Sequence, residues 1–335
     1  MKEIYPDIFL IKEGSGRLTV KAPVNLYVIG GPDGLIFDAG YGNKKQVKYV
    51  VREINKIKNL HDSKGKSLKI TRIMPSHAHP DHFSGLKYLK EKLGLKIITT
   101  RKTANIISSK RNFLKSFDLS FMSSDIEKRD ITEESKIPLK IKILYFLFIR
   151  FYRVSLVKEF DSIVRENAEI VINNEKWKII PSPGHSIDHI YLYNEEKGIL
   201  FSGDNILEDI TTWLGPPNSN LEDYINSLEI VLNLPNLKFI FPAHGNIMSD
   251  DPRKKVRELL EYRRSKTQQV FELLKENLGK KFTFKDIVKL VYPKTSKRKR
   301  MIRSGWIWET LKMLNRKNQI QSIEHNNETY FYFNE

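Results

Sequence analysis

The sequence predicts a layered α/β protein in which helices cover a β-sheet core. Short apolar segments bounded by Gly, Pro or Asn alternate with longer segments of helical periodicity over residues 1–250. Such alternation is typical of layered α/β folds. The length of 335 residues and the hydrophobic fraction of 40% allow about two domains and a sizeable core. Polar, glycine-containing motifs follow several of the apolar segments, which indicates a functional site at the ends of strands.

The expected elements of the core follow in chain order. Strands are expected at residues 8–11, 18–20, 26–29, 35–37, 70–74, 96–99, 168–172, 177–180, 190–193, 199–201 and 239–241. Helices are expected at residues 43–60, 83–93 and 221–232. Gly94 should end the second of these helices, because glycine adopts the left-handed backbone conformation that often follows a helix.

Residues 101–165 form a predicted helical insertion between core strands. The apolar segment at 137–153 is interrupted by Lys140, Lys142 and Arg150, so it is a poor candidate for a membrane span. We expect a helical lid or a homodimer surface that packs its own apolar side, and a helix lying on a membrane surface is the alternative.

The basic charge of the chain is confined to two regions. The formal net charge is +17; residues 251–335 carry +11, residues 101–165 carry +6, and the remainder is neutral. Localised positive charge indicates a polyanionic partner such as nucleic acid or an anionic membrane. The chain has no cysteine, which excludes disulfides and thiolate ligands. Its first residues lack the apolar stretch of a signal peptide, so a cytoplasmic location is expected.

A cluster of imidazoles and a carboxylate follows the predicted strand at 70–74. Three of the 8 histidines, His77, His79 and His82, occur within six residues together with Asp81. Neutral imidazole and carboxylate are ligands for zinc and neighbouring divalent metals. His77 and His79 point the same way in extended backbone, whereas Asp81 and His82 follow the turn set by Pro80. The cluster predicts a metal site with more ligands than one catalytic ion uses.

Three further side chains share the context of this cluster. His185, Asp204 and His244 each follow an apolar strand and lie on a glycine-containing turn. Because strand ends of a layered fold converge at one edge, we expect these residues to meet the first cluster.

The combined motifs resemble those of the metallo-β-lactamase superfamily. Five motifs occur in the order found in that family: residues 36–40 around Asp38, residues 77–82, residues 184–186, residues 202–204 and residues 243–245. The resemblance covers residues 1–250 and implies an αββα sandwich with two divalent metal ions at one edge. One ion would be bound by His77, His79 and His185, the other by Asp81, His82 and His244, with Asp204 bridging both. Asp38 would support the metal loop without binding metal.

The same resemblance implies hydrolytic chemistry. Two ions about 3.5–4 Å apart can share a bridging hydroxide and stabilise charge on attacking and leaving oxygens. Asp81 is expected to orient the water as well as bind metal. His189 is the second predicted catalytic residue, either as a donor to substrate or as a support for a ligand, and the alternative is a polar residue that only begins a strand. Zinc is the expected metal, and manganese or iron would accept the same ligands.

Residues 251–335 are predicted to form a basic winged-helix-like domain. A long helix at 254–277, a short helix at 285–291, a helix from the basic stretch at 294–300 to residue 314, and a hairpin around residues 326–327 make up this pattern. It resembles β-lactamase-like proteins with a C-terminal winged helix, a branch that includes single-strand-specific endoribonucleases. The residues expected to contact nucleic acid are Lys297, Arg298, Lys299, Arg300 and Arg303. Trp306 and Trp308 are expected to be buried.

Two substrate classes remain open at this point. The first prediction is a phosphodiesterase or endoribonuclease that acts on single-stranded RNA or DNA, held by the basic regions. The alternative is a thioesterase or lactonase-type hydrolase of small acyl substrates, similar to glyoxalase II. The apolar segment at 137–152 favours an acyl chain over a nucleotide.

Overall fold

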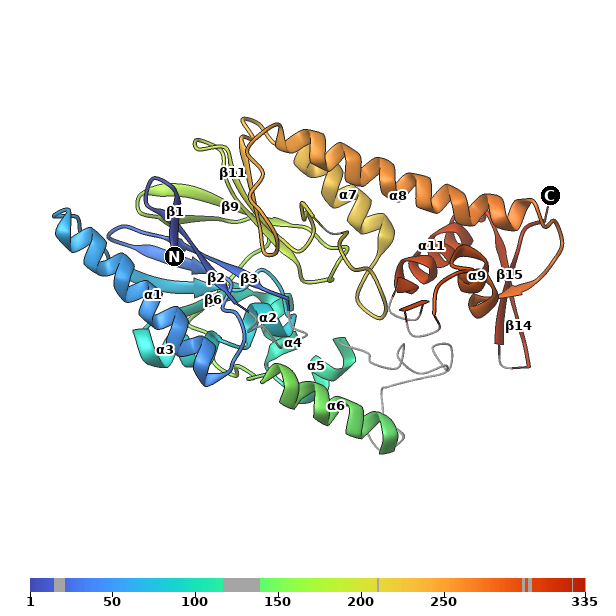
Figure 1. The fold of residues 1–335 in the computed structure, drawn as a ribbon, viewed down its shortest axis with the longest axis horizontal. Coiled ribbons are helices and arrows are strands. Elements are labelled where there is room, and N and C mark those ends of the chain that lie inside the picture. Colours follow the sequence, from blue (N-terminus) through green and yellow to red (C-terminus); the bar gives the residue numbers. More distant parts are fainter. Residues whose placement is uncertain are drawn as a thin grey trace.

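Two β-sheets pack face to face, and helices cover both outer faces (Figure 1). This computed structural model describes residues 1–14, 22–116, 139–209, 211–296, 299–300, 303–326 and 328–334. The architecture is the αββα sandwich predicted from the sequence. The strand expected at residues 18–20 lies outside the described residues.

The first sheet has the strand order β1-β2-β3-β4-β5-β6-β7. Its strands are β1 (Lys2–Tyr5), β2 (Ile8–Glu13), β3 (Val24–Ile29), β4 (Gly34–Phe37), β5 (Ile70–Met74), β6 (Lys96–Thr100) and β7 (Ser162–Val164). Neighbouring strands from β1 to β4 run antiparallel, whereas those from β4 to β7 run parallel. The parallel pairs bring the carboxyl ends of β4 and β5 to one edge of the sheet. The sequence patterns did not predict the outer strands β1 and β7.

The second sheet has the strand order β12-β11-β10-β9-β8. Its strands are β8 (Glu169–Ile172), β9 (Glu175–Pro181), β10 (Ile190–Asn194), β11 (Ile199–Gly203) and β12 (Phe239–Pro242). β11 and β12 run parallel, and the other neighbours run antiparallel. β9, β11 and β12 therefore all end at the same edge, where three predicted ligands follow them.

Large aromatic side chains fill the space between the sheets. Trp177 stacks on Phe201 with ring centroids 5.5 Å apart, and Tyr27 stacks on Phe241 at the same distance. All four side chains are buried and belong to one cluster that spans both sheets. Rings of this size supply much of the apolar area that holds two sheets together.

Helices on the outer face of the first sheet include the predicted insertion. They are α1 (Lys44–Ser63), α2 (Pro80–Phe83), α3 (Leu86–Leu93), α4 (Arg101–Ile107), α5 (Lys110–Ser116) and α6 (Leu139–Tyr152). Asn43 caps α1 by accepting a hydrogen bond from the backbone N–H of Gln46 at 2.9 Å. Gly94, with φ +70°, ends α3 as predicted. The helix expected at 83–93 corresponds to α3, which begins at Leu86. Phe83 belongs instead to the short helix α2, because Pro80 favours the first turn of a helix.

Helices on the outer face of the second sheet continue without a gap into the C-terminal region. These helices are α7 (Leu221–Leu232), α8 (Pro252–Lys275), α9 (Phe284–Val291) and α11 (Gly305–Arg316). A third sheet of order β13-β15-β14 follows, with β13 (Phe282–Thr283), β14 (Gln321–His325) and β15 (Glu328–Tyr332). One cluster of buried side chains connects Tyr193 on β10 through Val256 on α8 to Leu311 on α11. The division at residue 250 and the winged-helix assignment stay predictions.

The helix expected from the basic stretch to residue 314 is interrupted. Lys299, Arg300 and Arg303 are helical, the helical conformation stops at Ser304, and α11 starts at Gly305. Gly305 allows a close approach, since a Cβ atom there would lie 2.2 Å from the carbonyl oxygen of Leu214. α11 is thereby seated against the loop that follows β11.

Candidate metal centre

The histidine cluster lies on the loop between β5 and α2. His79 has extended backbone and precedes α2, whose first residue is Pro80. The rings of His77 and His79 lie 4.5 Å apart between centroids, and both stand beside the ring of His185. Asp81 and His82 belong to the short helix. The loop therefore presents ligands in two directions, as the sequence predicted.

All seven predicted ligands converge in two adjacent groups. The ligand atoms within each group lie within 4.8 Å of one another. The first group consists of His77, His79, His185 and Asp204, and the second consists of Asp81, His82 and His244.

Asp204 stands between the two groups. Its Oδ2 atom lies 3.4 Å from His185 Nε2 and 3.5 Å from His82 Nε2, and its Oδ1 atom lies 3.4 Å from His244 Nε2. The Oδ2 atom of Asp81 lies 3.5 Å from the same nitrogen of His244. This is the position of a carboxylate that can bridge two ions.

Several of these atoms are buried without any hydrogen-bond partner. They include Nε2 of His77, Nε2 of His82 and Oδ1 of Asp204. A buried polar atom without a partner is costly, so native structures rarely contain one unless an ion or water completes it. Imidazole nitrogen with carboxylate oxygen suits zinc, manganese or iron. The residues present thus fit divalent metal ions.

In three of the ligand rings, Nδ1 donates a hydrogen bond to an acceptor outside the two ligand groups. The Nδ1–H group of His185 donates to the carbonyl oxygen of Trp213 at 2.7 Å, and that of His244 donates to the carbonyl oxygen of Pro23 at 2.6 Å. His82 Nδ1 donates to Oδ2 of Asp38 at 2.9 Å. With Nδ1 protonated, each ring leaves Nε2 as a lone-pair ligand atom.

Asp38 supports the metal loop in the way that the family resemblance implied. Its Oδ1 atom accepts the backbone N–H of Ser76 at 2.7 Å, while Oδ2 accepts from His82. The residue is 1% exposed and adopts φ +68°, which places its side chain beneath the loop. One carboxylate therefore fixes both the start of the loop and a ligand ring.

Charges in the centre shift the pKa values in two directions. Burial, with the neighbouring histidines, holds the pKa values of His77 and His79 well below their usual value, so both rings stay neutral. Burial also acts to lower the pKa of His244, but Asp204 and Asp81 outweigh it and raise this pKa to about 9. The pKa of Asp81 is lowered to about 2, because His82 and His244 outweigh its burial. The second ligand group thus attracts positive charge.

His189 lies behind Asp204 and not at the surface of the site. Its Nε2 atom accepts the backbone N–H of Asp204 at 3.1 Å, its Nδ1 atom lies 2.7 Å from Oγ of Ser182, and the residue is 1% exposed. Because both ring nitrogens have partners within the chain, this geometry favours support of a ligand over contact with substrate, and the catalytic role of His189 stays a prediction.

Gly203 is required by this arrangement. It has φ +50°, and a Cβ atom there would lie 2.4 Å from His189 Nε2. A larger residue would push His189 away from the backbone of Asp204.

A second buried carboxylate, Asp188, ties the metal loop to α4. It accepts hydrogen bonds from Ser186 Oγ at 2.5 Å and from Thr103 Oγ1 at 2.9 Å, and also from the backbone of Ala78 between two ligands. Burial raises the pKa of Asp188. Its position next to His189 was visible in the sequence, but its partner on α4 carried no signal.

The loop after β11 links the centre to α8. Thr212 Oγ1 donates to the carbonyl oxygen of Asp204 at 2.8 Å. The buried guanidinium of Arg263 on α8 donates in turn to the carbonyl oxygen of Thr212 and lies over the ring of Tyr224. Sequence patterns gave no indication of this connection, because Arg263 resembles any other cation on a basic helix.

The predicted nucleic-acid contacts are only partly described. Lys297 and Arg298 lie outside the described residues. Lys299 and Arg303 are exposed, and Arg300 donates through Nε to the carbonyl oxygen of Thr295 at 2.6 Å. Their role stays a prediction.

The two tryptophans are used for packing. Trp306 is 9% exposed and donates to the hydroxyl of Tyr292 at 2.9 Å. Trp308 meets the rings of Phe284 and Phe331 edge to face. The expected burial is confirmed for Trp306, whereas Trp308 is half-buried and packs against the core cluster.

Comparisons with known proteins agree with this centre and fold. The chain is 34% identical over 129 residues to "Beta-lactamase-like protein 2 homolog" of Caenorhabditis elegans, which is 38% of this chain and 41% of that protein. It is 33% identical over 103 residues to "Atrochrysone carboxyl ACP thioesterase" of Aspergillus chevalieri, which is 31% of this chain and 32% of that protein. The matched stretch thus spans less than half of each relative.

Solved structures share this fold over nearly the full length of the chain. A metallo-β-lactamase family protein of Thermus thermophilus superposes with a TM-score of 0.69 at 17% identity, and covers 98% of this chain and 100% of its own. A β-lactamase domain protein of Burkholderia ambifaria superposes with a TM-score of 0.72 at 15% identity, over 99% and 93%. The sequence profile of the metallo-β-lactamase superfamily matches residues 20–244, a stretch that contains all seven ligands. The chain therefore belongs to the metallo-β-lactamase superfamily.

Proposed function

We propose that this protein is a hydrolase that binds two divalent metal ions and cleaves acyl esters or thioesters. The observation that carries the hydrolase proposal is the pair of adjacent ligand groups joined by Asp204. When bound in such a centre, divalent ions lower the pKa of water and polarise a carbonyl oxygen. Zinc is the first choice of metal for this donor set.

Asp81 is the residue placed to orient the attacking water. Its side chain is 18% exposed, whereas that of His82 beside it is fully buried. With a pKa lowered to about 2, the carboxylate is ionised at neutral pH and can accept a hydrogen bond from that water. His82 and His244 hold this carboxylate in place from two sides.

The acyl substrate class is supported by the apolar and aromatic surroundings of Asp81. Tyr152, the last residue of α6, stacks on Tyr41 with ring centroids 6.1 Å apart. Burial and the charge of Asp81 raise the pKa values of both tyrosines, so both remain neutral donors. The carbonyl oxygen of Arg153 approaches Gly42 closely. These contacts seat the C-terminal end of an apolar helix beside the ligands, and the name of the Aspergillus chevalieri relative supports a thioesterase.

Hydrolysis of a graded series of substrates tests this proposal. Protein loaded with zinc is expected to cleave p-nitrophenyl esters and acyl thioesters, with kcat/KM rising from two-carbon to eight-carbon chains. Asp81→Asn and His79→Ala should abolish this activity, while Asp33→Asn, at an exposed position outside the centre, should leave it unchanged. No turnover above the two variants with any chain length or metal would refute the acyl proposal.

A second candidate substrate is single-stranded nucleic acid. The net charge of +11 on residues 251–335 and the exposure of Lys299 and Arg303 favour it. Cleavage of a labelled oligonucleotide that is lost in His79→Ala would support this class. A slope of log K against log salt that is unchanged by neutralising residues 297–300 would remove the basic stretch from strand binding.

A further inference from the structure

α6 exposes a continuous apolar face. Ile143, Phe146, Leu147 and Phe151 are 51%, 63%, 54% and 47% exposed. Their spacing places all four on one side of the helix. A fully exposed side chain of this size has an area of about 200 Å², so the exposed fractions of these four leave roughly 400 Å² of apolar surface in contact with water. That area is within the range of the largest apolar patch on a typical monomer, which is often a binding site.

The opposite face of the same helix is fixed in the core. Tyr145 is 3% exposed, and Leu144, Phe148 and Ile149 pack against the cluster that α1, α3, α4 and α5 share with the first sheet. α6 is therefore held with a defined orientation, and its outer face cannot be buried by simple rotation. In Figure 1, α6 lies at the lower margin of the molecule beside α5.

Cations accompany the apolar face. Lys142, Phe146 and Arg150 are exposed at four-residue spacing and form one row along the helix, and Ile143, Leu147 and Phe151 form the next. Residues 135–158 contain six Lys or Arg and no Asp or Glu. Long cationic side chains can place their charge at headgroup level while their stems lie against apolar groups.

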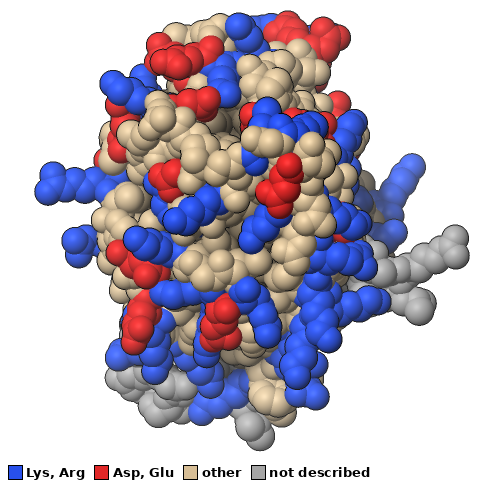
Figure 2. Space-filling model, turned by 90° about the vertical axis from the view of Figure 1, so that its left-hand side faces the viewer, with Lys and Arg blue, Asp and Glu red and all other residues tan. Residues whose placement is uncertain are grey.

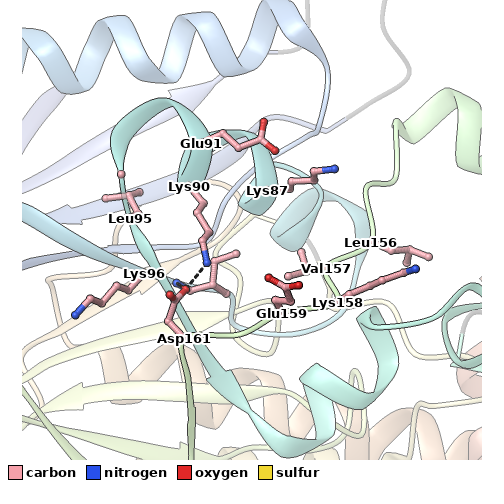
Figure 3. A pocket seen from close by; sticks show the side chains of 12 residues that line it. Lys87, Lys90, Glu91, Leu95, Lys96, Leu156, Val157, Lys158, Glu159 and Asp161 are labelled. Carbon is pink, nitrogen blue, oxygen red and sulfur yellow. Dashed lines mark hydrogen bonds and ion pairs between the residues drawn. The ribbon is translucent and has the colours of Figure 1, made fainter.

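Neighbouring segments extend this positive charge. The side chains of Lys110 and Lys115 on α5 are exposed. Figure 2 shows Lys and Arg gathering toward the lower edge of the molecule, the side on which α6 lies in Figure 1. A pocket of about 800 Å³ lies between α3 and the segment that follows α6. Its lining is mixed in charge: Figure 3 shows Lys87 and Lys158 extending away from the ion pair between Lys90 and Asp161, with Glu91 and Glu159 beside them, so the positive charge of this side is carried by α5 and α6 and not by the pocket.

We propose that the outer face of α6 docks the protein on the surface of an anionic lipid bilayer. Apolar side chains flanked only by cations are the pattern of helices that lie in the membrane interface. The complementary charge is supplied by acidic headgroups, which attract basic segments within a Debye length of the surface. No helix in the described ranges is long and apolar enough to cross a membrane.

Docking through α6 would bring the metal centre close to the lipid. Tyr152 at the end of α6 stacks on Tyr41, and Arg153 approaches Gly42. An amphiphilic substrate could then reach the ligands from the bilayer surface without crossing water. The docking itself does not depend on which bond the centre cleaves.

Co-sedimentation of the full chain with vesicles tests the proposal. Vesicles of phosphatidylcholine with 30% phosphatidylglycerol are expected to bind the protein at least ten-fold more tightly than phosphatidylcholine alone, and the difference should shrink as salt rises. The double variants Phe146→Ser/Leu147→Ser and Lys142→Gln/Arg150→Gln should each weaken binding to anionic vesicles by about ten-fold.

Matched controls distinguish the effect of the outer face of α6 from the effect of removing any exposed apolar or cationic side chain. Val171→Ser on β8 removes an equally exposed apolar side chain (52%), and Lys64→Gln/Lys66→Gln removes two exposed cations that follow the C-terminal end of α1, the end away from Gly42. Both should bind vesicles like the wild type, and all variants should keep the wild-type melting temperature and metal content. Equal binding to neutral and anionic vesicles, or binding unaffected by the α6 variants, would overturn the proposal. A dimer in solution that Phe146→Ser/Leu147→Ser dissociates would show that a second copy, and not lipid, covers this face.

Discussion

Replacing Asp38 by Asn tests whether one carboxylate sets the ligand state of His82. The change keeps the size of the side chain, and Asn tolerates the positive φ of +68° at this position. The Oδ1 contact to the backbone of Ser76 can survive, but an amide nitrogen in place of Oδ2 cannot accept the Nδ1–H of His82. His82 would then lose the partner that leaves its Nε2 atom free for metal.

The expected magnitude follows from the role of such supporting residues. Loss of a hydrogen bond that orients a ligand ring weakens metal binding by about 10 to 100-fold, or about 1.4 to 2.7 kcal/mol. Metal at 100 times its dissociation constant stabilises a fold by about 2.7 kcal/mol, and ten-fold weaker binding leaves about 1.4 kcal/mol. Asp38→Asn should therefore show a smaller rise in melting temperature on adding zinc.

Chelator competition with elemental analysis measures this effect directly. We expect the variant to hold one ion like the wild type and to lose the other at a lower chelator concentration, because Asp38 contacts the ring of His82, whereas Nδ1 of His77 and Nδ1 of His185 have Ser76 Oγ and the carbonyl oxygen of Trp213 as partners. Asp33→Asn, which changes an exposed carboxylate, provides the control. Two ions held as tightly in Asp38→Asn as in the wild type would show that the tautomer of His82 is fixed by something else.

Three further changes probe the centre and the surrounding fold. Gly203→Ala should displace His189 and lower the metal content. Gly65 has a similar positive φ but open space for Cβ, so Gly65→Ala should lower the free energy of unfolding by only about 1 kcal/mol. Equal metal content in the two variants would contradict this prediction. Removal of metal by chelator should lower the melting temperature reversibly, because Nε2 of His77 and Nε2 of His82 would stay buried without a partner. An unchanged melting temperature would argue against a metal centre. The hydrogen bond from Lys56, with the N-terminal ammonium, lowers the pKa of Glu53 from 4.5 to about 2, so its ionised form stabilises the fold above pH 4.5 and this contribution is lost as pH falls toward 2. Glu53→Gln should therefore reduce the unfolding free energy by about 1 kcal/mol at pH 7 and by nothing near pH 2, and a deficit that does not change with pH would refute the assignment.

The ligands were predictable because each one follows a strand in a short, chemically distinctive motif. His77 and Asp81 lie in one contiguous cluster, and His185 follows an apolar strand. The supporting contacts were not predictable, because they join distant segments whose residues are common everywhere. Thr103 is one threonine on a helix until the fold places it 2.9 Å from Asp188. Sequence periodicity likewise could not show which face of α6 is buried, since large apolar residues occur on both its buried and its exposed face.

The boundary predicted at residue 250 can be tested by a shortened chain. α8 covers α7 with Val256, Leu259 and Leu260, which are 0%, 4% and 4% exposed in the core cluster that includes the second sheet. Burying each such side chain contributes about 1.5–3 kcal/mol, so their loss removes much of a typical folding stability of about 5–15 kcal/mol.

Hydrogen bonds also hold α8 against the sandwich. Arg253 at the start of α8 donates to the carbonyl oxygens of Leu232 and Leu237 behind α7. Arg263 holds the loop that orders Asp204. A chain ending at residue 250 is therefore expected to lose cooperative unfolding and both metal ions, although every ligand is present in it. Cooperative unfolding of this fragment with two bound ions would instead show that the sandwich is complete without α8, and that the C-terminal region is a separate domain attached to it.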